Sequence, residues 1–470
     1  MQILHVTAEC YPYAKVGGLA DVLGALPKYL HQDGHHASVV MPMHRTKFLY
    51  QNEWEEVYKG HFFLYDWRVD YTIIKEKTNK LGFELFCVDI FGLLDRENVY
   101  SYSDDAERFL AFSTAVCEWV NSWETLPDVI HVHDHHTALI PFMMQHCQAY
   151  GRLNETPSVL TIHNAQYQGW MTWDYGKYIP AWNTWRWGLL DWNGLINPLA
   201  AGIKCAWRVT TVSPGYLGEI MHEANGLESL FAAEAQKCSG IINGIDTAVW
   251  DPETDTFIAH PFTIKTVSEG KQKNKEELCA EFNLDPQKPL AIFIGRLVGE
   301  KAADILPQAI TEAIFETKGE INFLILGSGE PNVERELAEL NNQFAGYYNA
   351  RIAYNEALSH RMYAGADFLL MPSRVEPCGL NQLYAMRYGT MPVVRSTGGL
   401  KDTVVDIGDD GYGIRFNNAT VSDLVYSINR CVDLFRQEEL FHKKREQMMA
   451  LDFSWERSAK EYIALYESLK

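Results

Sequence analysis

Short apolar runs alternate with helix-like segments along this chain, and this alternation constrains its fold more than any other feature. A first series of parallel-strand candidates occupies residues 2–7, 37–42, 129–134, 158–164 and 208–213. A second series occupies residues 290–296, 321–329, 350–355, 367–373 and 392–396. Strands that alternate with helices are joined by right-handed crossovers into parallel sheets. The sequence therefore predicts an α/β fold with Rossmann-like, doubly wound domains.

The length and the spacing of the two series predict two domains. A chain of 470 residues exceeds what one hydrophobic core usually supports. Residues 245–285 are rich in Asp, Thr and Pro and lack periodicity, so we interpret them as the segment that crosses between domains. We expect one domain over residues 1–245 and a second over 246–450. Residues 451–470 are expected to form an amphipathic helix that packs back across the domains, although a plain C-terminal helix fits equally well.

Charge and composition restrict the partners. A formal net charge of −20 argues against binding to nucleic acid or to an anionic membrane. No apolar run approaches the roughly 20 residues of a membrane span, and the N-terminus lacks the pattern of a signal peptide. The nine cysteines have neither metal-site nor disulfide-framework spacing, which fits a reducing cytoplasm. We therefore expect a cytoplasmic protein whose anionic ligands, if any, are bound by local bases.

Two similar glycine loops stand near opposite ends of the sequence. "AKVGGLADV" spans residues 14–22, and "RSTGGLKDTV" spans residues 395–404. Each follows a predicted strand and opens a predicted helix, where free backbone N–H groups and the helix dipole favour an anion. Each pair of glycines is also compatible with a plain turn. Because there are two copies, we expect both loops, Lys15–Asp21 and Thr397–Asp402, to contact one ligand bound between the domains.

The second series of strands also carries bases and a carboxylate where a ligand is expected. Arg296 and Lys301 follow the strand at 290–296, and Glu376 follows the strand at 367–373. Residues 378–381 then open a helix. Residues beyond the carboxyl ends of parallel strands face the ligand crevice. This pattern favours a site for an anionic ligand in the second domain.

The histidine-rich segment "HVHDHH", residues 131–136, is a candidate metal site by composition. In an extended strand His131, His133 and His135 share one face, whereas Asp134 and His136 point elsewhere. His163 ends another predicted strand in "TIHN" and is either a hydrogen-bonded core residue or a residue of the site. We expect no metal here and place His163 in the site.

Taken together, these motifs resemble the bacterial glycogen synthase and plant starch synthase family of retaining glucosyltransferases. The resemblance is carried by "KVGGLADV", "HVHDHH", "TIHNAQYQG", "TVSPGY", "NGID", "GRL", "EPCGLNQLYAMRYGT" and "GYGIRF", in family order from about residue 2 to 465. It implies a GT-B fold, with two Rossmann-like domains across a deep cleft. It also implies transfer of glucose from ADP-glucose to the non-reducing end of an α-1,4-glucan, with no cofactor and no metal.

The resemblance also implies roles for individual residues. On the nucleotide-sugar side it places Lys15, Gly18 and Asp21 of the first loop, Thr397 and Gly398 of the second, and Asn243, Tyr354, Leu380 and Asn381. Tyr354 is implied to stack on the adenine, and Asn243 and His163 to lie nearest the glucose. The residues implied to be catalytic are Arg296, Lys301, Glu376, His163 and Asp134, with Tyr384 at the second position of the E-x7-E element. The family has an aromatic residue where His135 stands, so Asp134 and His136 are placed on the acceptor side.

The residue types suit the chemistry. Glycosyl transfer passes through an oxocarbenium-like state while negative charge grows on the departing diphosphate. Arginine, lysine and helix amides stabilise such charge without a metal. No pair of carboxylates has a convincing arrangement for double displacement, so attack on the same face, assisted by the leaving phosphate, is favoured. This preference rests partly on the family.

The chain departs from the family at a few positions. Glu300 and Ala302 flank Lys301 where the family has Gln and Gly, Ala200 replaces a lysine, and Leu94 replaces an aromatic residue. These changes bear on affinity and donor preference. Two alternatives stay open: a synthase that prefers UDP-glucose, and a catalytically weak homologue that binds or primes glucan. The presence of Lys15, Arg296, Lys301 and Glu376 together argues against the second.

Overall fold

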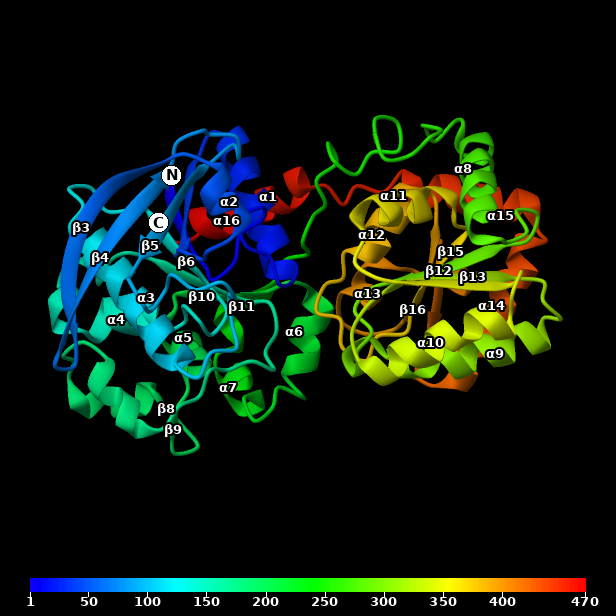
Figure 1. Cartoon of the computed structure of the whole chain (residues 1–470). Helices are drawn as coiled ribbons and strands as arrows, with labels where there is room; N and C mark the ends of the chain where they lie inside the picture. Colours follow the sequence, from blue (N-terminus) through cyan, green and yellow to red (C-terminus); the bar gives the residue numbers. More distant parts are fainter. The chain divides into compact units, whose positions relative to one another are not determined.

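The computed structural model describes all 470 residues, and they form two compact units (Figure 1). Unit 1 comprises residues 1–241 and 455–470, and unit 2 comprises residues 242–454. The chain therefore passes from unit 1 to unit 2 after Ile241 and returns at Trp455. Among all the helices, none combines the length and the apolar character that a membrane crossing requires.

Unit 1 is built on a nine-stranded sheet in the order β11-β10-β7-β6-β1-β2-β5-β4-β3. The strands from β11 to β5 are parallel, and only β4 and β3 run antiparallel to their neighbours. These strands are β1 (Gln2–Val6), β2 (His36–Pro42), β3 (Trp54–Leu64), β4 (Trp67–Glu76), β5 (Glu84–Asp89), β6 (Val129–His133), β7 (Ser158–Ile162), β10 (Arg208–Thr211) and β11 (Cys238–Gly240). A separate two-stranded ribbon pairs β8 (Asp191–Trp192) with β9 (Leu195–Ile196).

Unit 1 contains α-helices between its strands and one from the C-terminal end of the chain. They are α1 (Gly18–Gln32), α2 (Lys47–Gln51), α3 (Asp105–Asn121), α4 (Ile140–His146), α5 (Pro198–Cys205), α6 (Pro214–Ile220), α7 (Glu228–Ala233) and α16 (Trp455–Glu467). The last of these comes from the C-terminal end of the chain and shares a core with α1 and β1. Trp455, Tyr462 and Tyr466 of α16 are buried in that core, as their helical spacing predicts. The hydroxyl of Tyr466 lies 2.6 Å from Nδ1 of His131, which joins α16 to the centre of the sheet.

Unit 2 is built on a six-stranded parallel sheet in the order β14-β13-β12-β15-β16-β17. The strands are β12 (Leu290–Ile294), β13 (Asn322–Gly327), β14 (Tyr348–Ile352), β15 (Phe368–Met371), β16 (Met391–Arg395) and β17 (Ile414–Phe416). Alternate residues of β12 enter different cores: Ala291 and Phe293 pack on one face, whereas Leu290 and Ile292 pack on the other. The apolar runs of the sequence are thus strands buried on both faces, as in a doubly wound sheet.

Helices cover both faces of this sheet (Figure 1). They are α8 (Val267–Phe282), α9 (Leu306–Glu316), α10 (Pro331–Gln343), α11 (Glu356–Gly365), α12 (Asn381–Arg387), α13 (Gly398–Thr403), α14 (Val421–Phe435) and α15 (Glu438–Met449). Helices α9, α10 and α14 contribute to one core, and α8 and α11 contribute to the other. The predicted α/β fold with Rossmann-like domains is therefore confirmed.

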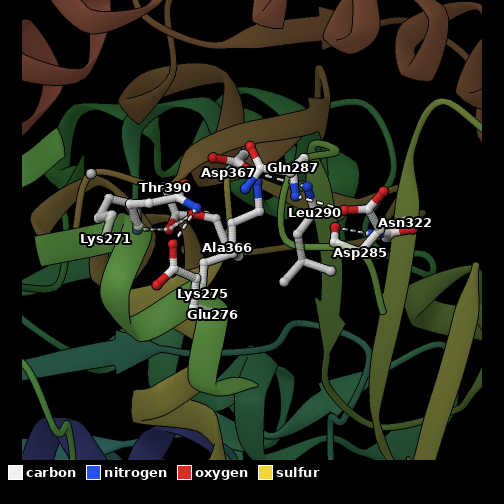
Figure 2. A network of polar contacts seen from close by, with 12 residues as sticks. Lys271, Lys275, Glu276, Asp285, Gln287, Leu290, Asn322, Ala366, Asp367 and Thr390 are labelled. Atoms are coloured by element: carbon white, nitrogen blue, oxygen red, sulfur yellow. Dashed lines mark hydrogen bonds and ion pairs between the residues drawn. The ribbon is translucent and has the colours of Figure 1, made fainter. Parts of the chain in front are cut away.

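Buried lysines fix α8 against the sheet of unit 2 (Figure 2). Lys271 Nζ donates to the carbonyl oxygens of Tyr363 and Tyr388, both at 2.9 Å, which lie at the C-terminal ends of α11 and α12. A cation there complements the helix dipoles. Lys275 pairs with Asp367 at 2.7 Å, and Asp367 also accepts the amide hydrogen of Leu290 at 2.9 Å. The interpretation of residues 245–285 as a crossing segment was therefore wrong for α8, which is an anchored helix of unit 2.

Candidate active site

The residues singled out from the sequence lie just past the carboxyl ends of parallel strands. In unit 1 they follow β1, β6 and β7, which are adjacent in the sheet. In unit 2 they follow β12, β15 and β16, which are also adjacent, and β14 at one edge. Asn243 is the exception, because it stands at the start of unit 2, three residues after β11. In unit 1, β1 lies between β6 and β2, and in unit 2, β12 lies between β13 and β15. The order of the strands reverses at β1 and at β12, and ligands bind at such a point in open α/β sheets.

The first glycine loop connects β1 to α1 and is held by internal charges. Lys15 Nζ pairs with Asp21 Oδ1 at 2.7 Å. Glu9, which is buried, accepts the amide hydrogens of Val16 and Gly17 through Oε2 at 2.6 and 3.0 Å. These two amides are therefore unavailable to a ligand, so the expectation of free backbone N–H groups does not hold for them. Gly18 opens α1, and in this first turn the Ala20 amide already donates to the Gly17 carbonyl oxygen at 3.3 Å.

The glycines of this loop are not required by packing. A Cβ added at Gly17 or at Gly18 would meet no atom within 4 Å. Neither residue has a positive φ angle. Space beside the backbone is what a closely approaching ligand needs.

Asp134 and His163 come together at the ends of β6 and β7. Asp134 has φ of 57°, in the left-handed region, and its Oδ1 accepts the His163 amide hydrogen at 2.7 Å. Burial raises the pKa of Asp134 to about 7. Since β6 ends at His133, His135 does not continue the strand face predicted for it. His136 stacks instead on Tyr100, with ring centroids 4.6 Å apart. Asp134 thus orients the backbone of the His163 loop.

The three histidines His5, His131 and His133 are buried close together, with one ring nitrogen of each within 4.8 Å of the others. Their nitrogens are largely engaged. His131 contacts Tyr466 and Thr161, both at 2.6 Å, and His133 contacts His5 at 3.2 Å and His163 at 3.1 Å. A metal would need lone pairs that these hydrogen bonds already use. The cluster is built as a hydrogen-bonded core.

In unit 2 a buried ion pair stands beyond β12 and β15. Lys301 Nζ lies 2.7 and 2.6 Å from the two carboxylate oxygens of Glu376. Glu376 also accepts a hydrogen bond from Ser373 Oγ at 2.9 Å. Arg296, whose side chain is 62% exposed, pairs with Glu300 at 3.2 Å. Two bases are therefore held by carboxylates at the end of this sheet.

The second glycine loop differs from the first in its packing. Gly398 has φ of 47°, and a Cβ there would lie 2.0 Å from the carbonyl oxygen of Glu376. The amide of Gly399 donates to that same oxygen at 3.1 Å. Thr397 is the N-cap residue of α13. The glycine at 398 is thus required by the fold, because it lets this loop pack against the backbone that carries Glu376.

The remaining predicted residues of unit 2 lie around the same strand ends. Asn381 begins α12 after Leu380, and its Nδ2 donates to the Ile294 carbonyl oxygen at 2.7 Å, which ties α12 to the end of β12. Asn243 is buried, and its Oδ1 has no hydrogen-bond partner. Tyr354, after β14, is 78% exposed. An unpartnered buried amide oxygen and a solvent-exposed ring are both features that a polar, ring-containing ligand would satisfy.

Sequence reasoning missed residues that act through tertiary contacts. Glu9 holds the first loop and accepts a hydrogen bond from Tyr100 at 2.5 Å, and Ser373 supports Glu376. Glu9 lies only three residues beyond the end of β1, so its place past a parallel strand was the available signal. The residues that Glu9 and Ser373 contact could not be predicted from the spacing of residues in the sequence.

The departures from the family pattern have distinct structural settings. Ala302 is buried with φ of 53°, a conformation that glycine adopts more easily. Glu300 pairs with Arg296. Ala200 and Leu94 are fully buried, so both are core residues.

Comparison with known proteins adds sequence and structural relatives. Residues 2–233 match the family described as starch synthase catalytic domain, and residues 288–433 match glycosyl transferases group 1. The chain is 52% identical to a glycogen synthase of Flavobacterium johnsoniae, covering 99% of this chain and 98% of that protein. It is 36% identical to a glycogen synthase of Streptococcus gordonii over the whole of both chains. The catalytic domain of starch synthase IV from Arabidopsis thaliana, bound to ADP and acarbose, is similar in structure, with a TM-score of 0.89, 31% identity, and coverage of 100% and 99%.

Proposed function

The chain belongs to the glycogen and starch synthase family of glycosyltransferases, and from this we propose that it transfers glucose from ADP-glucose to the non-reducing end of an α-1,4-glucan with retention of configuration. The observation that carries the proposal is the full-length identity of 52% to a glycogen synthase. The choice of ADP draws on the related starch synthase that was solved with ADP and acarbose bound.

We assign the donor phosphates to the bases of unit 2. Arg296 and Lys301 follow β12, and the first turn of α12 at Leu380 and Asn381 is tied to the end of that strand. Negative charge grows on the departing diphosphate as the glycosidic bond breaks. Preorganised cations and amides that meet this charge lower the barrier without needing to reorganise. The engagement of Lys301 by Glu376 fixes the ammonium group in place before the donor binds.

We assign the sugar to four of the predicted residues. Asn243 offers an unpartnered amide oxygen, His163 offers a ring nitrogen, and Lys15 and Gly18 belong to a loop with open space beside its backbone. Tyr354 is assigned to the adenine because its ring is exposed. Retention follows if the acceptor hydroxyl attacks the same face that the diphosphate leaves, with a phosphate oxygen taking the hydroxyl proton. The C1–phosphate bond breaks and the C1–acceptor bond forms, so ADP departs with the proton.

The experiment that tests this proposal measures glucose transfer to glycogen from labelled ADP-glucose and labelled UDP-glucose at equal concentrations. We expect faster transfer from ADP-glucose, and release of the label by an enzyme that hydrolyses only α-1,4 links. Faster transfer from UDP-glucose would show that UDP-glucose, and not ADP-glucose, is the preferred donor. Binding of glucan without transfer from either donor would favour a binding or priming homologue. Activity that survives EDTA is expected, because the assigned charge stabilisers are side chains and amides.

A further inference from the structure

A chain of hydrogen-bonded histidines leads from the core of unit 1 to His163. His5 on β1 places Nδ1 3.2 Å from Nε2 of His133 on β6. His133 in turn places Nδ1 3.1 Å from Nε2 of His163, which follows β7. His5 and His133 are fully buried, whereas His163 is partly exposed. The three rings come from adjacent parallel strands, so the sheet itself fixes their order.

All three imidazoles are neutral at ordinary pH. Burial lowers the pKa of His5 and of His163 to about 3, and burial, followed by the neighbouring histidines, lowers the pKa of His133 well below its usual value. A neutral imidazole has one N–H donor and one acceptor nitrogen. His133 uses both nitrogens, so it donates one hydrogen bond and accepts the other. The chain therefore has a direction, and only two directions are possible.

The inner end of the chain decides between the two directions. Nε2 of His5 is buried and has no hydrogen-bond partner. In one direction that nitrogen carries a hydrogen and becomes an orphaned buried donor, which is rare in proteins. In the other direction it is an unprotonated acceptor, while His5 Nδ1–H donates to His133 and His133 Nδ1–H donates to His163. The second direction leaves an unsatisfied buried acceptor in place of an unsatisfied buried donor, and it is favoured.

We propose that His133, backed by His5, is a positioning residue that holds His163 in the Nδ1–H tautomer, so that His163 serves the sugar substrate as a hydrogen-bond donor and not as a proton acceptor. This inference rests on the assignment of His163 to the sugar. The hydrogen bonds of His163 within the protein use Nε2, which contacts His133, and the backbone amide, which donates to Asp134, so Nδ1 is the nitrogen left for a substrate. The Asp134 carboxylate holds the backbone amide of the same residue, so both the position and the proton of His163 are fixed.

His131 lies next to the chain but does not belong to it. Its two nitrogens contact the hydroxyls of Tyr466 and Thr161 at 2.6 Å, and Thr161 Oγ1 continues to Thr210 at 2.6 Å. Hydroxyl groups both donate and accept, so they impose no tautomer on His131. The stacking of His131 on His133, with centroids 4.2 Å apart, leaves the ring edges of His133 free for His5 and His163. The direction of the chain is therefore set by His5 alone.

The test is the nitrogen-15 spectrum of the full-length protein with labelled histidine, with the His163 signals identified by their loss in His163→Gln. We expect the shift of a protonated nitrogen at Nδ1 and of an unprotonated nitrogen at Nε2. The opposite pattern, or a charged ring at neutral pH, would overturn the proposal. This result is read from the wild-type protein and does not depend on activity.

Two variants at His133 separate positioning from a merely structural role. An asparagine amide reaches about as far as Nδ1, so His133→Asn can still donate to His163, whereas the glutamine amide of His133→Gln reaches the Nε2 position instead. We expect His133→Asn to keep the tautomer and kcat, and His133→Gln to lose the tautomer and lower kcat roughly three- to tenfold. Equal kcat in the two variants, with unchanged His163 shifts, would contradict the proposal. If the tautomer is as expected but His163→Gln is fully active, the assignment of His163 to the sugar fails and the hydrogen-bond chain stands.

Discussion

Lys301 Nζ contacts both carboxylate oxygens of Glu376, at 2.7 and 2.6 Å, and so joins the loop after β12 to the loop after β15. The two side chains are mostly buried, 21% and 8% exposed. An ion pair in this setting positions each partner firmly, and loss of either leaves a buried charge uncompensated. The pair therefore serves two purposes: it places a cation for the diphosphate, and it orders the segment that leads into α12.

We predict that Lys301→Ala lowers turnover by roughly two to three orders of magnitude, because it removes a cation assigned to the leaving group. Glu376 would lose its cationic partner as well, so a lower unfolding midpoint is also expected. Steady-state kinetics and thermal unfolding measure the two effects. Lys273→Ala is the matched control, since Lys273 forms an exposed ion pair of 2.7 Å with Glu269 on α8. Near-normal turnover of Lys301→Ala would exclude the diphosphate assignment.

Glu300 is expected to weaken donor binding. Its carboxylate pairs with Arg296 at 3.2 Å, and this guanidinium must share its charge between the carboxylate and a bound diphosphate. We predict that Glu300→Gln lowers the KM for the nucleotide sugar by about two- to fivefold. The effect is small because the arginine of this pair is exposed, and exposed ion pairs are weak. The measurement is KM for the donor at low and high salt, and the gain should shrink as salt rises. Glu312→Gln, on the surface of α9, serves as the control. A raised KM would indicate that Glu300 itself contacts the donor.

Unit 1 is expected to lose stability in mild acid. Burial lowers the pKa of His5 and His163 to about 3 and that of His44 and His135 to about 4. The unfolded chain binds a proton at each of these residues near pH 6.5, whereas the folded chain does not, so the free energy of unfolding falls as the pH drops below 6.5. Each of these histidines lowers the free energy of unfolding by roughly 1.4 kcal/mol at pH 5.5. Asp134 acts in the opposite sense, because its raised pKa of about 7 means that the folded form gains protons first.

Tryptophan fluorescence can follow this loss, because Trp250 is the one tryptophan of unit 2 and the others lie in unit 1. We predict that the urea midpoint of the fluorescence transition falls between pH 7.5 and pH 5.5. The matched control is His442→Gln, which replaces an exposed histidine of unit 2 and leaves the buried histidines of unit 1 in place. A midpoint that is constant or rises over this range would show that the buried histidines do not remain neutral.

The parallel strands were predictable because each is an apolar run that is buried on both faces, as in "LAIFI" of β12. The hairpin of β3 and β4 was not predicted, because β3 is largely exposed and reads as a polar segment. Helix α8 was missed for a related reason: its lysines look like surface residues, yet Lys271 and Lys275 are buried among carbonyl and carboxylate oxygens. Burial of charge depends on partners distant in sequence, which periodicity does not reveal.

In the candidate site, too, some residues could be predicted from sequence and others could not. Residues that follow strands directly, such as Arg296 and His163, could be named from sequence, because strand ends define the ligand edge of an α/β sheet. The residues that hold these side chains in place could not be named from sequence. Glu9, Ser373 and His5 act through contacts that the sheet order creates, and a histidine within a buried strand has no sequence signal that separates it from an ordinary core residue.

The two glycine loops, similar in sequence, are expected to respond differently to the same substitution. A Cβ at Gly18 would enter open space, whereas a Cβ at Gly398 would lie 2.0 Å from a backbone oxygen and would also require a positive φ of 47°. Gly398→Ala should therefore destabilise the protein, by at least the roughly 1–2 kcal/mol that a left-handed conformation costs an L-residue. Gly18→Ala should fold normally and raise the KM for the donor, because the added methyl group occupies space assigned to the ligand.

Thermal unfolding and donor kinetics of the two variants, compared with Gly188→Ala, test this contrast. Gly188 is exposed, and a Cβ there also meets no atom within 4 Å, so Gly188→Ala should alter neither quantity. If Gly18→Ala keeps both a normal midpoint and a normal donor KM, the first loop is only a turn between β1 and α1. If Gly398→Ala unfolds at the wild-type temperature, the backbone of the second loop is more adaptable than its contact with Glu376 implies. The expected result, a stability defect at one loop and a binding defect at the other, means that the same Gly-Gly-Leu pattern meets a packing requirement at residue 398 and a ligand requirement at residue 18.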